Sequence, residues 1–183
     1  MRALVVEDDL ILAERLRETL EEWGAPTDLA HDLKSARELL SGSYGLVVFD
    51  VRLPDGSGIE IARSALVLRP APLLIAVSGQ ADRQEAFLLG RLGVRCFLDK
   101  PIDLMSFGGV IEQVLHEAPE LSADLCALVG QKKLHEVLGE VRRTMLEQAL
   151  ALTGGNRTEA ARLMGLTRQR IQQSIKELDL NQH

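Results

Sequence analysis

Residues 45–58 read GLVVFDVRLPDGSG, an apolar run that ends in one carboxylate and continues into a turn rich in Gly, Pro and Asp. An apolar run without alternation is typical of a strand buried on both faces, as in a parallel sheet covered by helices. Asp50 follows this predicted strand directly. It either belongs to the turn chemistry of Arg-Leu-Pro-Asp-Gly or is part of a site at the end of the sheet.

The same pattern of an apolar run and a helical segment repeats on both sides of this stretch. Strands are predicted at residues 3–6, 27–30, 45–49, 73–77 and 94–98, and helices at 9–23, 33–40, 58–66, 82–89 and 103–116. Alternating strands and helices indicate an α/β domain, and right-handed crossovers leave few strand orders. We predict a doubly wound, five-stranded parallel sheet over residues 1–117, a linker over 118–133 and a small all-α domain over 134–183.

The composition, with 46% apolar and 26% charged residues, is that of an ordinary globular protein. Apolar runs are far shorter than the roughly 20 residues of a membrane span, and acidic residues interrupt the N-terminal one, so we expect a cytoplasmic protein without a membrane partner. Cys96 and Cys126 lack metal-ligand spacing and are predicted to be buried free thiols.

Polar residues follow four of the five predicted strands. They are Glu7, Asp8 and Asp9 after the first, Asp50 after the third, Ser78 after the fourth and Lys100 after the fifth. Ligands of such sheets bind at the carboxyl ends of the strands, where these residues would meet. Clustered carboxylates suit Mg²⁺, Lys100 and Ser78 suit phosphoryl oxygens, and one carboxylate could be a nucleophile that forms an aspartyl-phosphate.

Each of these residues also has an ordinary structural explanation. Asp8 or Asp9 could cap the helix that follows, and Lys100 before Pro101 could be an exposed loop lysine. Taken singly, each residue favours the structural explanation. Their occurrence at the ends of four different strands favours a site.

The charge is distributed unevenly along the chain. Residues 1–130 hold 12 Lys/Arg and 21 Asp/Glu, a net −9, whereas residues 131–183 hold 9 and 6, a net +3, which gives the overall −6. Two units with different partners are indicated, the second being the one that could meet a polyanion.

Three helical patterns follow the linker, at residues 134–152, 158–164 and 168–178, with sharp turns at Gly154-Gly155 and Gly165. One face of the first is apolar and consists of Leu134, Leu138, Val141, Met145 and Leu152. The other two are predicted to pack through Leu163, Met164, Leu166, Ile171, Ile175 and Leu178. This leaves a polar set pointing outward: Thr167, Arg168, Gln169, Arg170, Gln173 and Lys176.

Arg and Gln make bidentate contacts to guanine and adenine in the major groove of double-stranded DNA. Asn156 and Thr158 stand at a predicted helix N-terminus that suits a DNA phosphate. The alternative is a helical dimerisation tail with a solvated polar face, because a net charge of +3 is modest for DNA binding.

Residues 1 to about 117 resemble the receiver domain of two-component response regulators, through VVEDD at 5–9, VVFDVRLPDGSG at 47–58, AVSG at 76–79 and FLDKP at 97–101. The resemblance implies a flavodoxin-like fold in which Asp50 is the phospho-acceptor and Ser78 and Lys100 bind phosphoryl oxygens. It implies a Mg²⁺ ion bound by Asp8, Asp50 and the Arg52 carbonyl, with Glu7 reaching it through water. It also implies an aromatic switch at Phe97 and a cis peptide bond between Lys100 and Pro101.

Haloacid-dehalogenase-type phosphatases also use an Asp nucleophile, but they need a second Asp two residues later, where this chain has Arg52. No GxxxxGK[ST] loop occurs, so ATP is not the expected ligand. We therefore expect no enzyme activity beyond slow self-dephosphorylation.

Residues 153–178, TGGNRTEAARLMGLTRQRIQQSIKEL, resemble the Fis-type helix-turn-helix, and residues 134–152 resemble the long dimerising helix of that family. The positions that carry the resemblance are Asn156, Thr158, Ala160, Ala161, Gly165 and Arg168. Fis is basic where this chain has Gln172, Gln173 and Ser174, which implies weaker phosphate contact and more reliance on dimerisation. A receiver joined directly to such a tail is similar to the RegA/PrrA/ActR group of regulators.

Together the resemblances imply a response regulator of transcription. A sensor histidine kinase would phosphorylate Asp50, and a homodimer would bind double-stranded DNA, with RNA polymerase as a further candidate partner. The alternative is a receiver whose helical tail dimerises and acts through protein–protein contacts.

Overall fold

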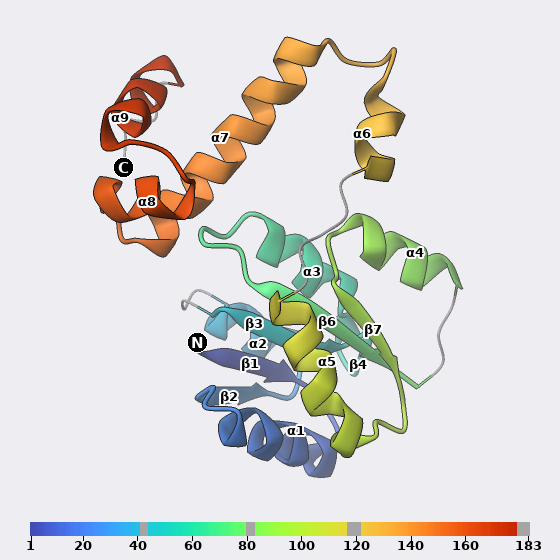
Figure 1. Ribbon diagram of the computed structural model, residues 1–183. Coiled ribbons are helices and arrows are strands. Elements are labelled where there is room, and N and C mark those ends of the chain that lie inside the picture. Colours follow the sequence, from blue (N-terminus) through green and yellow to red (C-terminus); the bar gives the residue numbers. More distant parts are fainter. Residues whose placement is uncertain (41–43, 80–82, 117–121, 179–183) are drawn as a thin grey trace. The chain divides into compact units, whose positions relative to one another are not determined.

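The computed structural model describes residues 1–40, 44–79, 83–116 and 122–178. The chain divides into two compact units, Met1–Glu117 and Ala118–His183 (Figure 1). None of the helices in the described ranges is long and apolar enough to cross a membrane.

The first unit is built on a parallel sheet of five strands in the order β2-β1-β3-β6-β7. These strands are β1 (Ala3–Val6), β2 (Thr27–Ala30), β3 (Leu46–Asp50), β6 (Leu73–Ser78) and β7 (Cys96–Asp99). The predicted doubly wound fold is confirmed. β3 extends one residue beyond its predicted end, because Asp50 pairs in register with Val77 of β6.

Helices cover both faces of this sheet (Figure 1). They are α1 (Leu10–Glu22) and α5 (Leu104–His116) on one face, and α2 (Leu33–Leu39), α3 (Ile59–Leu66) and α4 (Arg83–Arg91) on the other. Alternate residues of β1 enter different cores: Val5 packs with α1 and α5, whereas Leu4 and Val6 pack with α2, α3 and α4. Burial on both faces explains why the strands read as continuous apolar runs.

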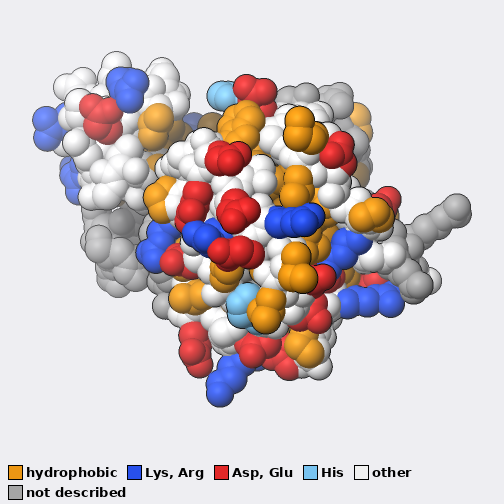
Figure 2. All heavy atoms as spheres, turned by 90° about the horizontal axis from the view of Figure 1, so that it is seen from below, with side chains coloured by type: hydrophobic (Ala, Val, Ile, Leu, Met, Phe, Trp, Pro, Cys, Tyr) orange, Lys and Arg blue, Asp and Glu red, His pale blue; other side chains and the backbone are white. Residues whose placement is uncertain are grey.

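The face of the first unit that carries α1 is rich in charge. Seen from below the view of Figure 1, acidic side chains gather around basic ones on this side (Figure 2). On α1 itself, Arg17 forms ion pairs with Glu14 and Glu21 one turn away on either side. Such exposed pairs along one helix add little stability each.

A short antiparallel hairpin, β4 (Arg52–Leu53) and β5 (Gly56–Ser57), follows β3 immediately. The sequence predicted only a turn here. Gly58 then leads into α3, and a Cβ at Gly58 would lie 2.1 Å from the Asp50 carbonyl oxygen. Only glycine therefore fits where the hairpin returns to the end of β3.

The second unit consists of α6 (Ser122–Leu128), α7 (Leu134–Leu152), α8 (Arg157–Leu163) and α9 (Arg168–Glu177). α7 has its predicted bounds, and α6 shows that the predicted linker is partly helical. Gly165, with φ of +63°, makes the turn between α8 and α9. This left-handed conformation strains other residues.

The core of the second unit is small, with Leu146, Ala161, Ile171 and Ile175 buried at its centre. Met164 and Leu178 pack against it as predicted, but Leu163 and Leu166 are 53% and 41% exposed, so their assignment to this core was wrong. The core is completed instead by Leu146 and Leu150 from α7.

Both cysteines are free thiols, as predicted, but the prediction that they are buried was wrong. Cys96 is half-buried in β7 and Cys126 is exposed on α6. Cys126 was predicted to be buried because its neighbours are apolar, and these neighbours, Leu125 and Val129, are themselves exposed.

Candidate functional site

The carboxyl ends of β1, β3, β6 and β7 meet at one edge of the sheet. Glu7 follows β1, Asp50 and Ser78 are the last residues of β3 and β6, and Lys100 follows β7. Strand pairing fixes this arrangement, with Asp50 opposite Val77 and Ser78 opposite Asp99. The parallel register therefore brings together residues that are up to 93 positions apart in the chain.

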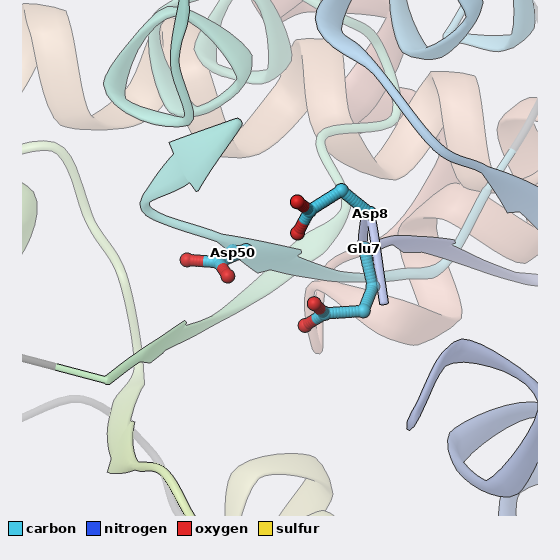
Figure 3. Close-up of side chains that lie close together, drawn as sticks. All are labelled: Glu7, Asp8 and Asp50. Carbon is cyan, nitrogen blue, oxygen red and sulfur yellow. The ribbon is translucent and has the colours of Figure 1, made fainter. Parts of the chain in front are cut away.

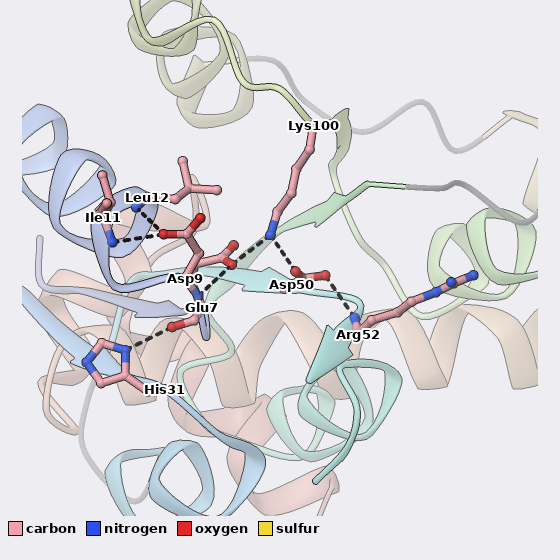
Figure 4. Close-up of polar contacts among 8 residues, drawn as sticks. All are labelled: Glu7, Asp9, Ile11, Leu12, His31, Asp50, Arg52 and Lys100. Atoms are coloured by element: carbon pink, nitrogen blue, oxygen red, sulfur yellow. Dashed lines mark hydrogen bonds and ion pairs between the residues drawn. The ribbon is translucent and has the colours of Figure 1, made fainter. Parts of the chain in front are cut away.

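Lys100 lies between two carboxylates at this edge (Figure 4). Its Nζ is 2.7 Å from Oε1 of Glu7 and 2.5 Å from Oδ2 of Asp50. The backbone N–H of Arg52 donates to the other Asp50 oxygen, Oδ1, at 2.8 Å. Glu7 and Asp50 are only 1% and 6% exposed, so Lys100 compensates charges that are largely shielded from water.

Burial shifts the acid–base properties of this cluster. It raises the pKa of Glu7, and the hydrogen bond from Lys100 opposes this only in part. Burial alone would lower the pKa of Lys100, but hydrogen bonds to Asp50 and Glu7 outweigh it, and the pKa of Lys100 is raised. Lys100 therefore keeps its positive charge at neutral pH.

Glu7, Asp8 and Asp50 could hold a divalent cation. They offer carboxylate oxygens that lie within 4.8 Å of one another, and Figure 3 shows them around a common space at the ends of β1 and β3. Oε2 of Glu7 is buried without a hydrogen-bond partner, while Asp8 is exposed to water. A buried, unpartnered oxygen calls for an explanation, and a cation with hard oxygen ligands such as Mg²⁺ fits it.

Asp9 has the ordinary role that was considered for it. Its carboxylate accepts the backbone N–H groups of Ile11 and Leu12, at 2.9 and 3.1 Å, and so caps α1. Ser78 is fully buried at the end of β6. Phe97 is half-buried and packs against the core shared by α2, α3 and α4. The peptide bond between Lys100 and Pro101 is cis, as the resemblance implied.

The sequence of the first unit matches a known family over most of its length. Residues 3–111 match the family described as the response regulator receiver domain. The chain belongs to the response regulator receiver family. Residues 138–178, from α7 to just beyond α9, match the family described as bacterial regulatory protein, Fis family. Both matches agree with the resemblances drawn from the motifs.

Among the relatives, PmrA of Pseudomonas aeruginosa is 30% identical in an alignment that covers all of this chain and 78% of PmrA. RegA of Rhodobacter capsulatus, a photosynthetic apparatus regulatory protein, is 24% identical over 94% of this chain and 89% of RegA. PilR of Pseudomonas aeruginosa is 28% identical over 84% of this chain, which spans only 36% of the length of PilR.

Solved receivers share the fold of the first unit. The non-phosphorylated HemR receiver domain of Leptospira biflexa superposes with a TM-score of 0.59 at 32% identity, covering 65% of this chain and 97% of that domain. A response regulator of Burkholderia pseudomallei covers 94% of this chain and 96% of its own with a TM-score of 0.56. At 22% identity, this second likeness concerns the fold alone.

In the second unit, the residues predicted to contact DNA are all exposed. They are Asn156 and Thr158 at the start of α8, and Thr167, Arg168, Gln169, Arg170, Gln173 and Lys176 on or next to α9. Two of them also cap helices: the Asn156 oxygen accepts from the N–H groups of Thr158 and Glu159, and the Thr167 hydroxyl accepts from the N–H of Arg170.

Two of the positions where Fis is basic, Gln173 and Ser174, differ in exposure. Ser174 is 4% exposed and faces the core of the second unit, so this position cannot contact a DNA phosphate. Gln173 is exposed, and its amide is held by the Arg170 guanidinium at 3.2 Å and by Glu177 at 2.8 Å. Glu177 also pairs with Arg142 of α7, a link that the sequence did not suggest.

Two further residues near the receiver site were missed from the sequence. Asp55, in the turn of the β4–β5 hairpin, accepts the N–H groups of Leu33 and Lys34 at the start of α2. Glu85 of α4 lies 3.9 Å from the Arg52 guanidinium. Because both contacts join segments distant in sequence, no local pattern signals them.

Proposed function

We propose that this protein is a response regulator of transcription. Asp50 accepts a phosphoryl group from a sensor histidine kinase, and the second unit binds double-stranded DNA. One observation carries the proposal: a buried Asp50 carboxylate paired with Lys100, beside an unpartnered Glu7 oxygen, occurs in the same chain as a Fis-family segment. Under this proposal, the chain is a phospho-acceptor with slow self-dephosphorylation. It works in the cytoplasm, where the DNA that it binds is located.

In the transfer step, an Asp50 oxygen attacks the phosphorus of a phosphohistidine, the P–O bond forms and the P–N bond breaks. The electron pair of the broken bond stays on the imidazole nitrogen. Lys100 is placed to follow the new phosphoryl oxygens, and the Arg52 N–H holds the carboxylate. Bound Mg²⁺ would supply positive charge for the phosphoryl oxygens. Asp8, Asp50 and the Arg52 carbonyl would hold the ion directly, and Glu7 through water.

A cavity next to Lys100 supports access by a donor. It has a volume of about 530 Å³. Besides Lys100, its lining consists of Asp9, Ile11, Leu12 and Arg15 from the cap and first turns of α1, Gly79 after β6, and Pro101, Ile102 and Leu104 up to the start of α5. Of these residues, Ile11 is 71% exposed. Of the charged cluster, the cavity reaches Lys100, and its apolar lining residues suit a protein donor that presents a histidine.

The signal would leave the site through Ser78 and Phe97. The phosphoryl charge draws the Ser78 hydroxyl, and Phe97, which is only half-buried, can then pack further into the core. Such a change shifts an existing equilibrium of the surface that β7, α4 and α5 form.

Dimerisation would run along α7. The apolar face predicted there is exposed, with Leu134, Leu138, Val141, Met145 and Leu152 each between 41% and 74% accessible. A helix with an unpartnered apolar face gains by pairing with a second copy. A homodimer would present two α9 helices to one DNA site and could recruit RNA polymerase without ATP hydrolysis.

DNA selection from randomised duplexes, with and without beryllofluoride and Mg²⁺ as a phosphoryl mimic, tests the proposal. We expect selective binding that changes with the mimic. On the selected site, Arg168→Ala should weaken binding roughly tenfold or more, since one bidentate base contact contributes about 1–3 kcal/mol. Arg63→Ala is the matched control, because it removes the same guanidinium charge from the exposed last turn of α3 in the first unit. A dimer that binds no duplex in either state would favour the protein-contact alternative.

A further inference from the structure

The β4–β5 hairpin is attached at its tip to α2. Oδ1 of Asp55 accepts the N–H of Leu33 at 2.8 Å, and Oδ2 accepts the N–H of Lys34 at 3.1 Å. A Cβ at Gly56 would lie 2.8 Å from a Leu33 methyl group, so the hairpin backbone rests directly on this side chain. The local cap of α2 is a different residue, Asp32, which accepts the N–H of Ser35 at 2.7 Å.

At its other end the same hairpin is attached to the phospho-acceptor. The Arg52 N–H donates to Asp50 Oδ1 at 2.8 Å, and the Gly58 N–H donates to the Val51 carbonyl at 2.9 Å. Only two residue pairs separate the ends, because Arg52 pairs with Ser57 and Leu53 with Gly56. A hairpin this short transmits a displacement of its tip to Arg52.

We propose that Asp55 is a positioning residue for the Asp50 site. By fixing the hairpin on α2, Asp55 holds the Arg52 amide against the Asp50 carboxylate and keeps the Arg52 carbonyl in place. The inference rests on the proposed function, in which Asp50 accepts the phosphoryl group and that carbonyl binds Mg²⁺. Asp55 acts through Arg52 and does not itself touch the phosphoryl group. Partners that orient metal ligands typically change metal affinity by 10- to 100-fold.

Two substitutions, one in the hairpin and one at the cap of α2, separate a positioning role from a simple loss of stability. Asp55→Ala and Asp32→Ala each remove a carboxylate that accepts N–H groups of the same helix terminus. Each should lower the melting temperature of the full chain by a similar few degrees, about 2–4 °C. Mg²⁺ affinity, measured by calorimetric titration with the metal alone, should fall about tenfold in Asp55→Ala and stay unchanged in Asp32→Ala.

Phosphorylation by acetyl phosphate gives a second measurement. Asp55→Ala should be slow at low Mg²⁺ and approach the wild-type rate at saturating Mg²⁺, whereas Asp32→Ala should follow the wild type throughout. Asp55→Asn, which keeps one acceptor oxygen, should lie between the two and serves if Asp55→Ala fails to fold.

Equal losses of Mg²⁺ affinity in Asp55→Ala and Asp32→Ala would overturn the positioning role, because loosening of α2 would then explain both. Unchanged affinity in both the Ala and Asn variants of Asp55 would overturn it as well. A wild-type chain that binds no Mg²⁺ and takes up no phosphate would instead overturn the proposed function itself.

Discussion

The two units treat charge and apolar surface in opposite ways. The first buries Glu7 and Asp50 and compensates them with Lys100, so its site is assembled within one chain. The second leaves its Arg and Gln side chains and the apolar face of α7 in solvent. A buried cluster of this kind suits small ions or groups, whereas exposed polar and apolar faces are typical of surfaces that bind macromolecules. Substitutions in the two units should therefore fail in different ways.

The largest effect is expected from Asp50→Asn. An amide is a far poorer nucleophile than a carboxylate, so phosphate uptake from acetyl phosphate should fall by at least about 100-fold. The measurement is incorporation of label or intact mass. Asp99→Asn is the matched control, because Asp99 is an exposed carboxylate at the end of β7, which β6 separates from β3, and should label like the wild type. Equal labelling of Asp50→Asn and the wild type would show that Asp50 is not the phospho-acceptor.

The next effect belongs to the second unit. Leu138→Glu combined with Val141→Glu places two charges on the apolar face of α7 without touching the core, because both residues are exposed at 56% and 41%. Each buried apolar side chain contributes about 1.5–3 kcal/mol, so the dissociation constant of the dimer should rise by at least about 100-fold. Sedimentation velocity measures this, and DNA binding should fall with it.

The control for this experiment is Val67→Glu, which changes an equally apolar residue that is 76% exposed after α3. Folding of the α7 variant is checked by its helical circular dichroism. A dimer that survives both charges on α7 would show that another surface pairs the chains.

Glu7→Gln should show how burial of charge costs stability in the first unit. Because the pKa of Glu7 is raised above 4.5, the folded chain binds its proton more tightly than the unfolded chain. The free energy of unfolding should therefore fall as pH rises through the titration of Glu7, and Glu7→Gln should lose this slope. Urea unfolding with a chelator, from acid to neutral pH, measures both.

Mg²⁺ should stabilise the wild type more than it stabilises Glu7→Gln. At a concentration about 100 times its dissociation constant, a ligand of the folded state adds about 2.7 kcal/mol to the free energy of unfolding. The wild type should gain this much, and Glu7→Gln less, because its buried carboxylate charge is gone. An equal gain in the free energy of unfolding of both proteins would show that Glu7 does not contribute to the metal site.

Much of the first unit could be predicted because its information is local. The apolar runs gave β1 and β2 their bounds, and the rule that parallel strands end at one edge placed Glu7, Asp50 and Lys100 together. The contacts of Asp55 with α2 could not be predicted, because its partners lie 21 and 22 residues away and PDG reads as a turn. The contact between Glu85 and Arg52 could not be predicted for the same reason.

In the second unit, periodicity located the helices but did not show which apolar residues are buried. Leu163 and Leu166 were assigned to the core and are exposed, whereas Leu146 of α7 fills it. A helix of seven residues such as α8 has few core positions, and its buried ones are Ala160 and Ala161. Small residues that allow close approach were more informative here than large ones.

The smallest effect concerns the two thiols, one in each unit. Burial raises the pKa of Cys96, which is half-buried in β7, while Cys126 is exposed on α6. The thiolate is the reactive form, so a thiol reagent should modify the exposed Cys126 roughly tenfold faster than Cys96. The variant Cys126→Ser assigns the two rates to their residues. Cys96 is adjacent to Phe97, so beryllofluoride with Mg²⁺ should change its rate if Phe97 repacks, and should leave the rate at Cys126 as it was. A change confined to Cys126 would mean that the phosphoryl signal reaches the second unit without passing through β7.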